Sequence, residues 1–366
     1  TTISSAKRTL CRQASSCEAA LSVMMATESG WRVAGIYNCS FEKPSFYLSM
    51  RILLVKTSSL GDVIHNLPVV SDIKRHFPGA VVDWCVEESF AAIPRLHPGV
   101  EEVIPVAVRR WRKAFFKAST WQEIATFRTQ LQGKVYDAVI DTQGLLKSAL
   151  IASRARGPLS GYAADSAREP LAARFYDRHF SVATSEHAVA RSRQLAAAAL
   201  GYTADGNAEY GIEAPAVSFG WFPAGPYVVF LTATSRDDKL WPESHWTTLG
   251  RQLQALGYGI VLPAGNPVER ERAARLAAEI HGAVAAPSLS INELAALLKG
   301  ARAVIGVDTG LSHLAVALKT PTVALYVATD PGLTGVIGNG FYRNLGGKAQ
   351  MPAPEVVLAA LQPVLA

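Results

Sequence analysis

The 366-residue sequence has few of the residues that mark disulfide-stapled, zinc-bound or membrane-spanning proteins. Only four residues are cysteine, three of them lie within the first 49 positions, and none is spaced as a CxxC pair. A disulfide framework and a structural zinc site are therefore not indicated. No apolar run approaches the roughly 18 to 20 residues that span a bilayer. We expect a cytoplasmic, reducing setting, with attachment to a membrane surface left open.

Several enzyme signatures are also missing. The sequence contains no GxGxxG, no GxxxxGK[ST] and no HExxH motif. It therefore lacks the motifs that usually mark a dinucleotide-dependent oxidoreductase, a P-loop NTPase and a zinc protease. No DxD-type carboxylate pair ends a strand, and we expect no metal. The excess of basic residues is mild, with a net charge of +6. It suits an anionic small substrate or membrane surface better than a nucleic acid, which we do not expect as a partner.

The remaining composition is that of a folded α/β protein: 49% of residues are hydrophobic and 18% charged. Strand and helix patterns alternate from residue 50 to about 215, and the same scheme restarts near 227, as doubly wound sheets require. We predict two Rossmann-like domains, 50–215 and 216–366, that face each other across a cleft. Predicted strands are 52–55, 81–87, 100–108, 136–143, 227–232, 259–265 and 303–310, and 322–332 is predicted as a final strand and loop. Predicted helices begin near 62 and cover 89–96, 120–132, 144–155, 187–202, 241–259, 269–282, 290–301, 311–320 and 354–365.

Residues 1–49 differ from the rest of the chain. They show no sustained strand or helix period and no apolar segment followed by a cleavage site. Met50 directly precedes the first clear strand. We expect Met50 to be the natural first residue and 1–49 to be upstream sequence or poorly ordered, which N-terminal sequencing of the native protein would test.

The stretch 51–70, RILLVKTSSLGDVIHNLPVV, predicts a buried strand, a loop of small residues and a helix that opens near Asp62. Open α/β sheets bind ligands above the carboxyl ends of their strands, and Gly61 allows a close approach of the backbone there. Ser59 and Gly61 would thus lie beside the ligand. Asp62 is either a first-turn acid that complements the helix dipole or an ionised base that acts on a substrate hydroxyl. This stretch alone leaves both open.

Three groups are predicted at the matching edge of the second sheet. Thr234, Ser235 and Lys239 follow the strand 227–232, and hydroxyls with one cation at a helix start suit a diphosphate, although N-capping is an equal alternative for the hydroxyls. Asp308, Thr309 and Gly310 begin the next helix and offer free N–H groups, although the Asp308 side chain would repel a phosphate and better suits a contact to the loop or a hydroxyl. His313 lies one turn further, where a lone histidine is by itself more often a structural residue. Glu269 at a helix start is either a ribose acceptor or a plain first-turn acid.

The run 109–117, RRWRKAFFK, places five cations among three aromatic residues. A solvated charged face is the default interpretation of such a run. The aromatic side chains would serve no purpose there, and the run follows a strand that ends over the cleft. A loop of this kind would grip an acceptor that carries phosphates or carboxylates through Arg109, Arg110, Arg112 and Lys113.

Several blocks of the sequence together resemble the lipopolysaccharide heptosyltransferases, a family of GT-B glycosyltransferases. The blocks are VKTSSLGDVIHNLP, VIPVAVRRWRKAFF, YDAVIDTQGLLKS, AREPLAARFY, RDDKLWPESHW, and VDTGLSHLAVAL with TDPGL. The similarity covers nearly everything from Met50 onward, and residues 1–49 have no counterpart. It implies a GT-B fold and metal-independent, inverting transfer of heptose from ADP-L-glycero-β-D-manno-heptose to the first Kdo of Kdo2-lipid A. It also implies peripheral contact with the cytoplasmic face of the inner membrane and no cofactor.

The resemblance assigns roles position by position. Asp62 matches the general base, and Lys239 matches the diphosphate ligand, assisted by Thr234 and by Ser235, which replaces a threonine familiar in relatives. The ribose-contacting acid matches Glu269, and the donor-site loop and helix match Asp308, Thr309, Gly310 and His313. The acceptor-binding positions match Arg109, Arg110, Arg112, Lys113 and Arg168. The alternatives are a paralogous heptosyltransferase with another acceptor, and a non-catalytic module that binds a nucleotide sugar or a polyanion.

Overall fold

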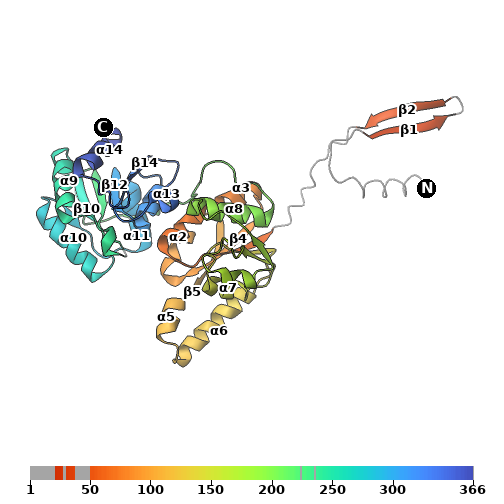
Figure 1. Cartoon of the computed structure of the whole chain (residues 1–366), viewed down its shortest axis with the longest axis horizontal. Helices are drawn as coiled ribbons and strands as arrows, with labels where there is room; N and C mark the ends of the chain where they lie inside the picture. The colour runs from red at the N-terminus through yellow and green to blue at the C-terminus, as the bar shows by residue number, and fades with distance from the viewer. Residues whose placement is uncertain (1–20, 28–29, 38–49, 223–224, 235, 366) are drawn as a thin grey trace. The chain divides into compact units, whose positions relative to one another are not determined.

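The computed structural model describes residues 21–27, 30–37, 50–222, 225–234 and 236–365 (Figure 1). The chain divides into two compact units, Thr1–Leu48 and Ser49–Ala366. In the first unit, β1 (Leu21–Thr27) and β2 (Gly30–Tyr37) pair antiparallel. The prediction that this region carries no strand is therefore wrong. The β-branched and aromatic residues in LSVMMAT and GWRVAGIY are the signal for these strands, although they do not alternate regularly.

The second unit begins with a six-stranded parallel sheet in the order β5-β4-β3-β6-β7-β8. Its strands are β3 (Arg51–Val55), β4 (Val81–Glu87), β5 (Val100–Val106), β6 (Ala138–Asp141), β7 (Leu159–Tyr162) and β8 (Arg178–Phe180). The α-helices between and after them are α2 (Leu60–His65), α3 (Leu67–His76), α4 (Ala92–Arg95), α5 (Val108–Lys113), α6 (Ala118–Gln132), α7 (Leu146–Ala152) and α8 (Ala188–Leu200). Short 3-10 turns cover 88–90 and 170–175. The direction of winding reverses between β3 and β6, which lie side by side.

A second parallel sheet repeats this order as β11-β10-β9-β12-β13-β14. Its strands are β9 (Tyr227–Leu231), β10 (Gly259–Leu262), β11 (Val284–Ala285), β12 (Ala303–Val307), β13 (Thr322–Tyr326) and β14 (Tyr342–Gly346). Its α-helices are α9 (Glu243–Ala255), α10 (Pro267–Glu279), α11 (Ile291–Gly300), α12 (Gly310–Ala317), α13 (Pro331–Thr334) and α14 (Pro354–Leu365). Here the winding reverses between β9 and β12. Two sheets of the doubly wound type confirm the predicted α/β class.

Local sequence explains why the central elements form where they do. Strands β3 and β9 read RILLV and YVVFL, continuous apolar runs that suit a parallel sheet covered on both faces. Pro68 lies in the first turn of α3, and α2 ends just before it at Asn66. Proline has no backbone N–H to donate, so it fits the first turn of a helix but interrupts a helix interior. Gly201 ends α8 with φ +77°, as predicted. Ser290 and Glu293 form the predicted capping box of α11.

In the second unit, the sequence pattern missed four short strands, namely β7, β8, β11 and β14. Each has five residues or fewer, and three of them carry residues such as Gly, Arg or Asn that weaken a strand pattern. The run 109–117 was predicted as a loop, and this is wrong for its first part, which forms α5. Arg, Trp and Lys are adequate helix formers, so a basic run does not by itself exclude a helix.

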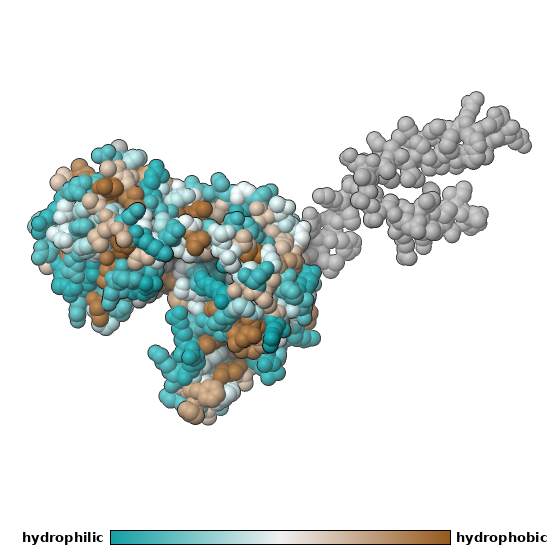
Figure 2. All heavy atoms as spheres, in the orientation of Figure 1, coloured by the Kyte–Doolittle hydropathy of each residue, from teal (hydrophilic) through white to brown (hydrophobic). Residues whose placement is uncertain are grey.

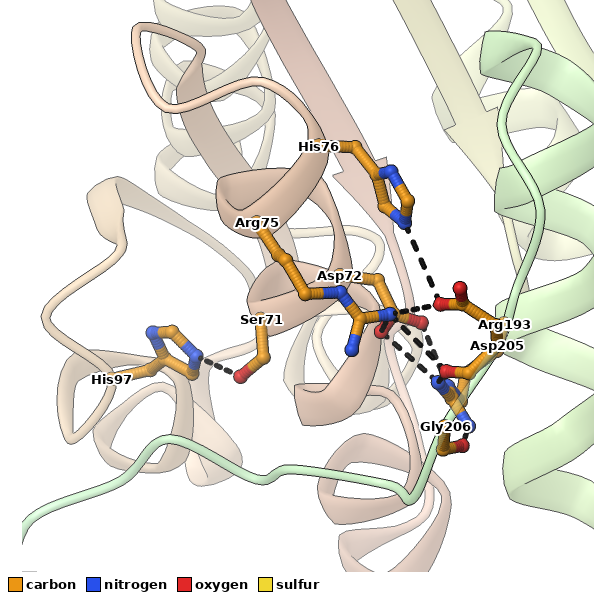
Figure 3. A network of polar contacts seen from close by, with 8 residues as sticks. All are labelled: Ser71, Asp72, Arg75, His76, His97, Arg193, Asp205 and Gly206. Atoms are coloured by element: carbon orange, nitrogen blue, oxygen red, sulfur yellow. Dashed lines mark hydrogen bonds and ion pairs between the residues drawn. The ribbon is translucent and has the colours of Figure 1, made fainter.

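A buried ion pair attaches the segment after α8 to the first sheet's helices (Figure 3). The Arg193 guanidinium donates to Asp72 at 2.7 and 3.1 Å, and both side chains are almost fully buried. Arg193 also donates to the backbone oxygens of Asp205 and Gly206. Arg75 gives Asp72 a second cation at 3.1 Å. The network fixes the start of the irregular segment 203–222 that leads to the second sheet.

We expect Arg193→Met to lower the free energy of unfolding by about 2 kcal/mol. Removing one partner of a buried pair leaves the other charge uncompensated, which costs about 3 to 5 kcal/mol. Arg75 remains beside Asp72, so the loss is smaller here. Urea unfolding of the variant beside Arg251→Met, an exposed arginine paired with Glu279, measures the difference. Equal midpoints for the two variants would contradict this account.

Candidate functional site

Three loops that follow central strands converge where the winding reverses in each sheet. The loop after β3 comes from the first sheet, and the loops after β9 and β12 come from the second. This is the position at which parallel α/β sheets bind ligands. The amino-terminal turn of α2 packs against that of α12, and a β-carbon on Gly310 would come within 2.8 Å of the Leu60 side chain. Glycine is thus required at 310 for the two halves to meet this closely.

A pocket of about 450 Å³ lies between these loops. Its lining includes eleven of the sixteen predicted site residues: Ser59, Gly61, Asp62, Arg109, Arg168, Thr234, Lys239, Asp308, Thr309, Gly310 and His313. Leu60, His65, Phe90, Thr329 and Thr334 complete it. Residues far apart in the sequence thus share one polar cavity. Ser235 lies outside the described residues.

Asp62 is the third residue of α2, and its carboxylate is held from two sides. Oδ2 accepts the Ser59 N–H at 2.9 Å and the Ser59 hydroxyl at 3.2 Å, which is the capping-box geometry. Arg168 donates to Oδ1 at 2.9 Å and to Oδ2 at 3.3 Å. The carboxylate therefore serves as a helix cap and also faces the pocket, so the capping and catalytic interpretations do not exclude each other.

Opposing effects set the pKa of Asp62. Burial alone would raise it, but the positive charges of Lys56 and Arg168 and the Ser59 N–H together hold the pKa below its usual range. The group is thus ionised at neutral pH. A carboxylate paired with arginine is a weak base, because the guanidinium stabilises its charged form. Displacement of Arg168 by another anion would raise the pKa of Asp62 and strengthen it as a base.

Two buried groups beneath this loop were not predicted from the sequence. Lys56 is almost fully buried and donates to the backbone oxygen of Thr142 at 2.7 Å. Burial lowers its pKa to about 8, although Asp62 and Asp141 act in the opposite direction. The Gln143 side-chain oxygen accepts the N–H groups of Thr57 and Ser58, each at 3.1 Å. Lys56 directly follows a four-residue apolar run and precedes TSSLGD, but a lysine in such a place is usually exposed, so the sequence pattern does not indicate its burial.

The opposite wall of the pocket contains a paired cation. Lys239 donates to Asp308 Oδ2 at 2.6 Å, and the Thr329 hydroxyl donates to the same oxygen at 2.8 Å. The Thr234 hydroxyl donates to the backbone oxygen of Asp308 at 2.9 Å. Asp308 thus positions Lys239 and the loop after β9 beside the amino-terminal turn of α12. Thr329, which begins the block TDPGL, was not singled out from the sequence.

Three histidines line up where the halves meet. His65 Nε2 lies 3.0 Å from His313 Nδ1, and the His187 ring centre lies 5.8 Å from that of His65. Burial lowers the pKa of His313 to about 4 and that of His65 well below its usual value. Both imidazoles are therefore neutral at physiological pH. His313 faces the pocket as an uncharged hydrogen-bonding group, and His65 is a partner that the sequence pattern did not reveal.

A second pocket of about 510 Å³ lies beside the first and has a largely apolar lining. Leu60, Thr234 and Thr309 border both pockets. Glu269 lines the second pocket, where its carboxylate accepts the N–H groups of Gly265 at 2.7 Å and Asn266 at 3.4 Å. It caps α10 and also borders the cavity. An apolar cavity with a carboxylate at its rim fits the base and ribose of a nucleoside.

The basic run does not act as one surface. Arg109 lines the main pocket, and its guanidinium lies over the Phe90 ring at 5.2 Å from the ring centre. Arg110 forms ion pairs with Glu88 and Glu123 instead. Arg112 and Lys113 are exposed and lie outside the pocket lining. The structure thus brings Arg109 and Arg168 to the pocket and separates the other three cations from it.

Within the parts of the chain that the structure describes, no group of three or more His, Cys, Asp or Glu side chains is arranged to hold a metal ion. Among the same residues, no helix has the length and apolar character needed to cross a bilayer.

Comparisons with known proteins identify the family of the chain. Residues 124–356 match the family model of glycosyltransferase family 9 (heptosyltransferase). The chain belongs to glycosyltransferase family 9. It is 49% identical over 291 residues to lipopolysaccharide heptosyltransferase 1 of Pseudomonas aeruginosa, a match that covers 79% of this chain and 82% of that protein.

Solved structures of the family match as well. E. coli heptosyltransferase WaaC with ADP is 45% identical, with a TM-score of 0.79, and the match covers 86% of this chain and 100% of that one. E. coli heptosyltransferase WaaC with ADP-2-deoxy-2-fluoro heptose gives a TM-score of 0.77 at 44% identity, over 86% and 99% of the two chains. The predicted family and its fold of two facing doubly wound sheets are therefore confirmed, and the chain is a heptosyltransferase-family enzyme.

Proposed function

We propose that the chain transfers L-glycero-D-manno-heptose from ADP-heptose to the first Kdo of Kdo2-lipid A, with inversion, at the cytoplasmic face of the inner membrane. The observation that carries the proposal is that Asp62 and Lys239 line one pocket from opposite halves. Support also comes from relatives named lipopolysaccharide heptosyltransferase 1 and from a related structure that contains an ADP-heptose analogue. Residues 50–215 would hold the acceptor and 216–366 the donor.

The two pockets suggest how the donor would lie. The base and ribose would occupy the apolar pocket beside Glu269, which leaves the diphosphate next to Thr309, Gly310 and Lys239. The free N–H groups at the start of α12 and the Lys239 ammonium would receive negative charge. Heptose would then extend into the main pocket, with its anomeric carbon toward Asp62.

In the proposed reaction, Asp62 takes the proton of the acceptor hydroxyl as that oxygen attacks the anomeric carbon. The bond from this carbon to the diphosphate oxygen breaks, and ADP leaves with the electron pair. Positive charge builds on the sugar ring and negative charge on ADP, so a carboxylate on one side and Lys239 on the other stabilise the transition state. The proposed reaction needs no metal, because Lys239 and the backbone N–H groups at the start of α12 would face the leaving group.

Transfer of heptose from ADP-heptose to Kdo2-lipid A by the chain starting at Met50 tests the proposal. Product with an inverted anomeric centre supports it. Binding of ADP-heptose without transfer to this acceptor, together with transfer to a heptosylated core acceptor, would favour the paralogous reaction. Donor binding without turnover on either acceptor would favour a binding module.

We expect Arg168→Ala to weaken acceptor use and to change its pH dependence. A carboxylate on the acceptor would replace Asp62 as the partner of Arg168, and a hydrogen bond to a charged group contributes about 1.5 to 3 kcal/mol. The acceptor KM should therefore rise by about 10 to 100-fold. Because Arg168 lowers the pKa of Asp62, its removal raises that pKa, and the acidic limb of the kcat/KM profile should move to higher pH.

Steady-state kinetics across pH, with Arg251→Ala as the control, measure both effects. Arg251 is an exposed arginine paired with Glu279 in the other half. A raised KM with an unmoved acidic limb would mean that Arg168 binds acceptor without tuning Asp62. If neither the acceptor KM nor the acidic limb changes, both proposed roles of Arg168 are contradicted.

A further inference from the structure

The hairpin of α5 and α6 ends in an exposed group of aromatic rings. Phe116 is 99% exposed, while Phe115 and Trp121 are about half exposed. The Phe115 ring centre lies 5.9 Å from that of Phe116 and 4.8 Å from that of Trp121. The Trp121 indole N–H also donates to the Phe115 backbone oxygen at 3.0 Å. The three rings, named here the aromatic tip, are therefore held together rather than scattered.

Internal packing explains the inner part of the hairpin but not its tip. Trp111 packs edge-on against Phe127 with ring centres 5.7 Å apart, and its indole N–H donates to Glu123 at 2.8 Å. These contacts fix α5 against α6 and leave the tip facing outward. Figure 2 shows hydrophobic atoms at the end of this hairpin beside strongly hydrophilic ones. Clustered exposed aromatic rings on a folded protein mark an interaction surface.

Basic residues predominate in the sequence around the tip. Residues 103–122 contain five Lys or Arg and no Asp or Glu. Arg110 is neutralised by Glu88 and Glu123. Arg112, Lys113 and Lys117 are exposed close to the rings in sequence. Aromatic rings combined with cations match the interface of an anionic bilayer, where rings lie at headgroup depth and long basic side chains reach lipid phosphates.

We propose that the aromatic tip inserts into the headgroup region of an anionic membrane and that Arg112, Lys113 and Lys117 bind its phosphates. The inference rests on the proposed function in one respect, since a lipid acceptor has to be reached from a membrane. The short helix α5 connects the two places: Arg109 lines the pocket, and six helical residues extend about 9 Å at 1.5 Å each. With the aromatic tip in the headgroup region, the pocket would lie about the length of α5 from the lipid surface.

Vesicle co-sedimentation without acceptor or donor tests the surface directly. Wild-type protein should bind vesicles of phosphatidylethanolamine with phosphatidylglycerol and bind phosphatidylcholine vesicles far less. The double variant Phe115→Ser/Phe116→Ser should partition about tenfold or more less well, as expected for removing two inserted apolar side chains. The control Leu256→Ser/Met351→Ser also removes two exposed apolar side chains, in the second half of the chain, and should bind like wild type.

The depth to which the aromatic tip enters the bilayer is measured by quenching of tryptophan fluorescence with brominated lipids. Quenching should occur in wild type and be largely absent in Trp121→Phe. Wild-type vesicle binding by the double variant, or quenching that persists in Trp121→Phe, would overturn the inference. Equal binding to both vesicle types would overturn the role of the cations.

Activity separates this inference from the proposed function. The double variant should keep wild-type kcat with an acceptor stripped of its acyl chains and lose about tenfold in kcat/KM with acceptor embedded in anionic vesicles. Equal losses with both acceptors would show that the tip acts on the acceptor sugar or on folding, and would overturn the membrane role. Absence of transfer by wild type to either acceptor would overturn the proposed function, while the lipid measurements still decide this inference.

Discussion

Asp62→Asn is expected to lower heptose transfer by about 10² to 10⁴-fold, the range for loss of a general base, while donor binding is retained. Asparagine keeps an oxygen that accepts the Ser59 N–H, so the start of α2 should persist. What disappears is the ionised group that takes the acceptor proton. Because Asp62 faces the pocket and is ionised at neutral pH, the loss should appear in kcat and much less in ADP affinity.

The measurement is single-turnover transfer together with calorimetric binding of ADP. Glu293→Gln is the matched control, because Glu293 forms the same type of capping box with Ser290 but faces neither of the two pockets. It should leave the transfer rate unchanged. If the Asp62→Asn variant keeps most of the transfer activity, Asp62 acts only as a helix cap. A rate loss accompanied by an equal loss of ADP binding would indicate a distorted site instead of a missing base.

The sequence predicted the parts of the molecule whose signals are local. Strands such as β3 and β9 are continuous apolar runs, and α11 carries its own capping box, so these elements were predictable residue by residue. The order of strands and helices also predicted the loops that lie where the winding of each sheet reverses. The positions of Asp62 and Lys239 after the first strand of each sheet could therefore be predicted from sequence patterns alone.

Contacts between residues that are far apart in the sequence could not be predicted from sequence patterns. The pairing of Arg168 with Asp62 joins positions 106 residues apart, and that of His65 with His313 joins positions 248 apart. No periodicity encodes such contacts. Lys56 was missed for another reason: a lysine after an apolar run is usually solvent-exposed, and only the three-dimensional structure shows that it is buried beneath the site. The basic run was predicted as one acceptor surface, although Glu88 and Glu123 divide it.

Lys239→Met is expected to lower kcat/KM for ADP-heptose by about 10² to 10³-fold, as for other losses of a preorganised group at a developing anion. Methionine keeps much of the side-chain length while it removes the charge. Lys239 lies on the wall opposite Asp62 and is oriented by Asp308 at 2.6 Å. Once the diphosphate is bound, the ammonium would stabilise the charge that develops on departing ADP, so both kcat and ADP affinity should fall.

Transfer kinetics and ADP binding for Lys239→Met, beside Lys299→Met, measure this effect. Lys299 donates to the Leu318 backbone oxygen at 3.0 Å and lines neither pocket, so its variant controls for loss of one hydrogen-bonded ammonium. Asp308→Asn should reproduce part of the defect, because it loosens Lys239 without removing its charge. Unchanged ADP binding and kcat in Lys239→Met would place the diphosphate elsewhere. A defect in Lys239→Met that Asp308→Asn does not share at all would show that the ammonium needs no positioning by Asp308.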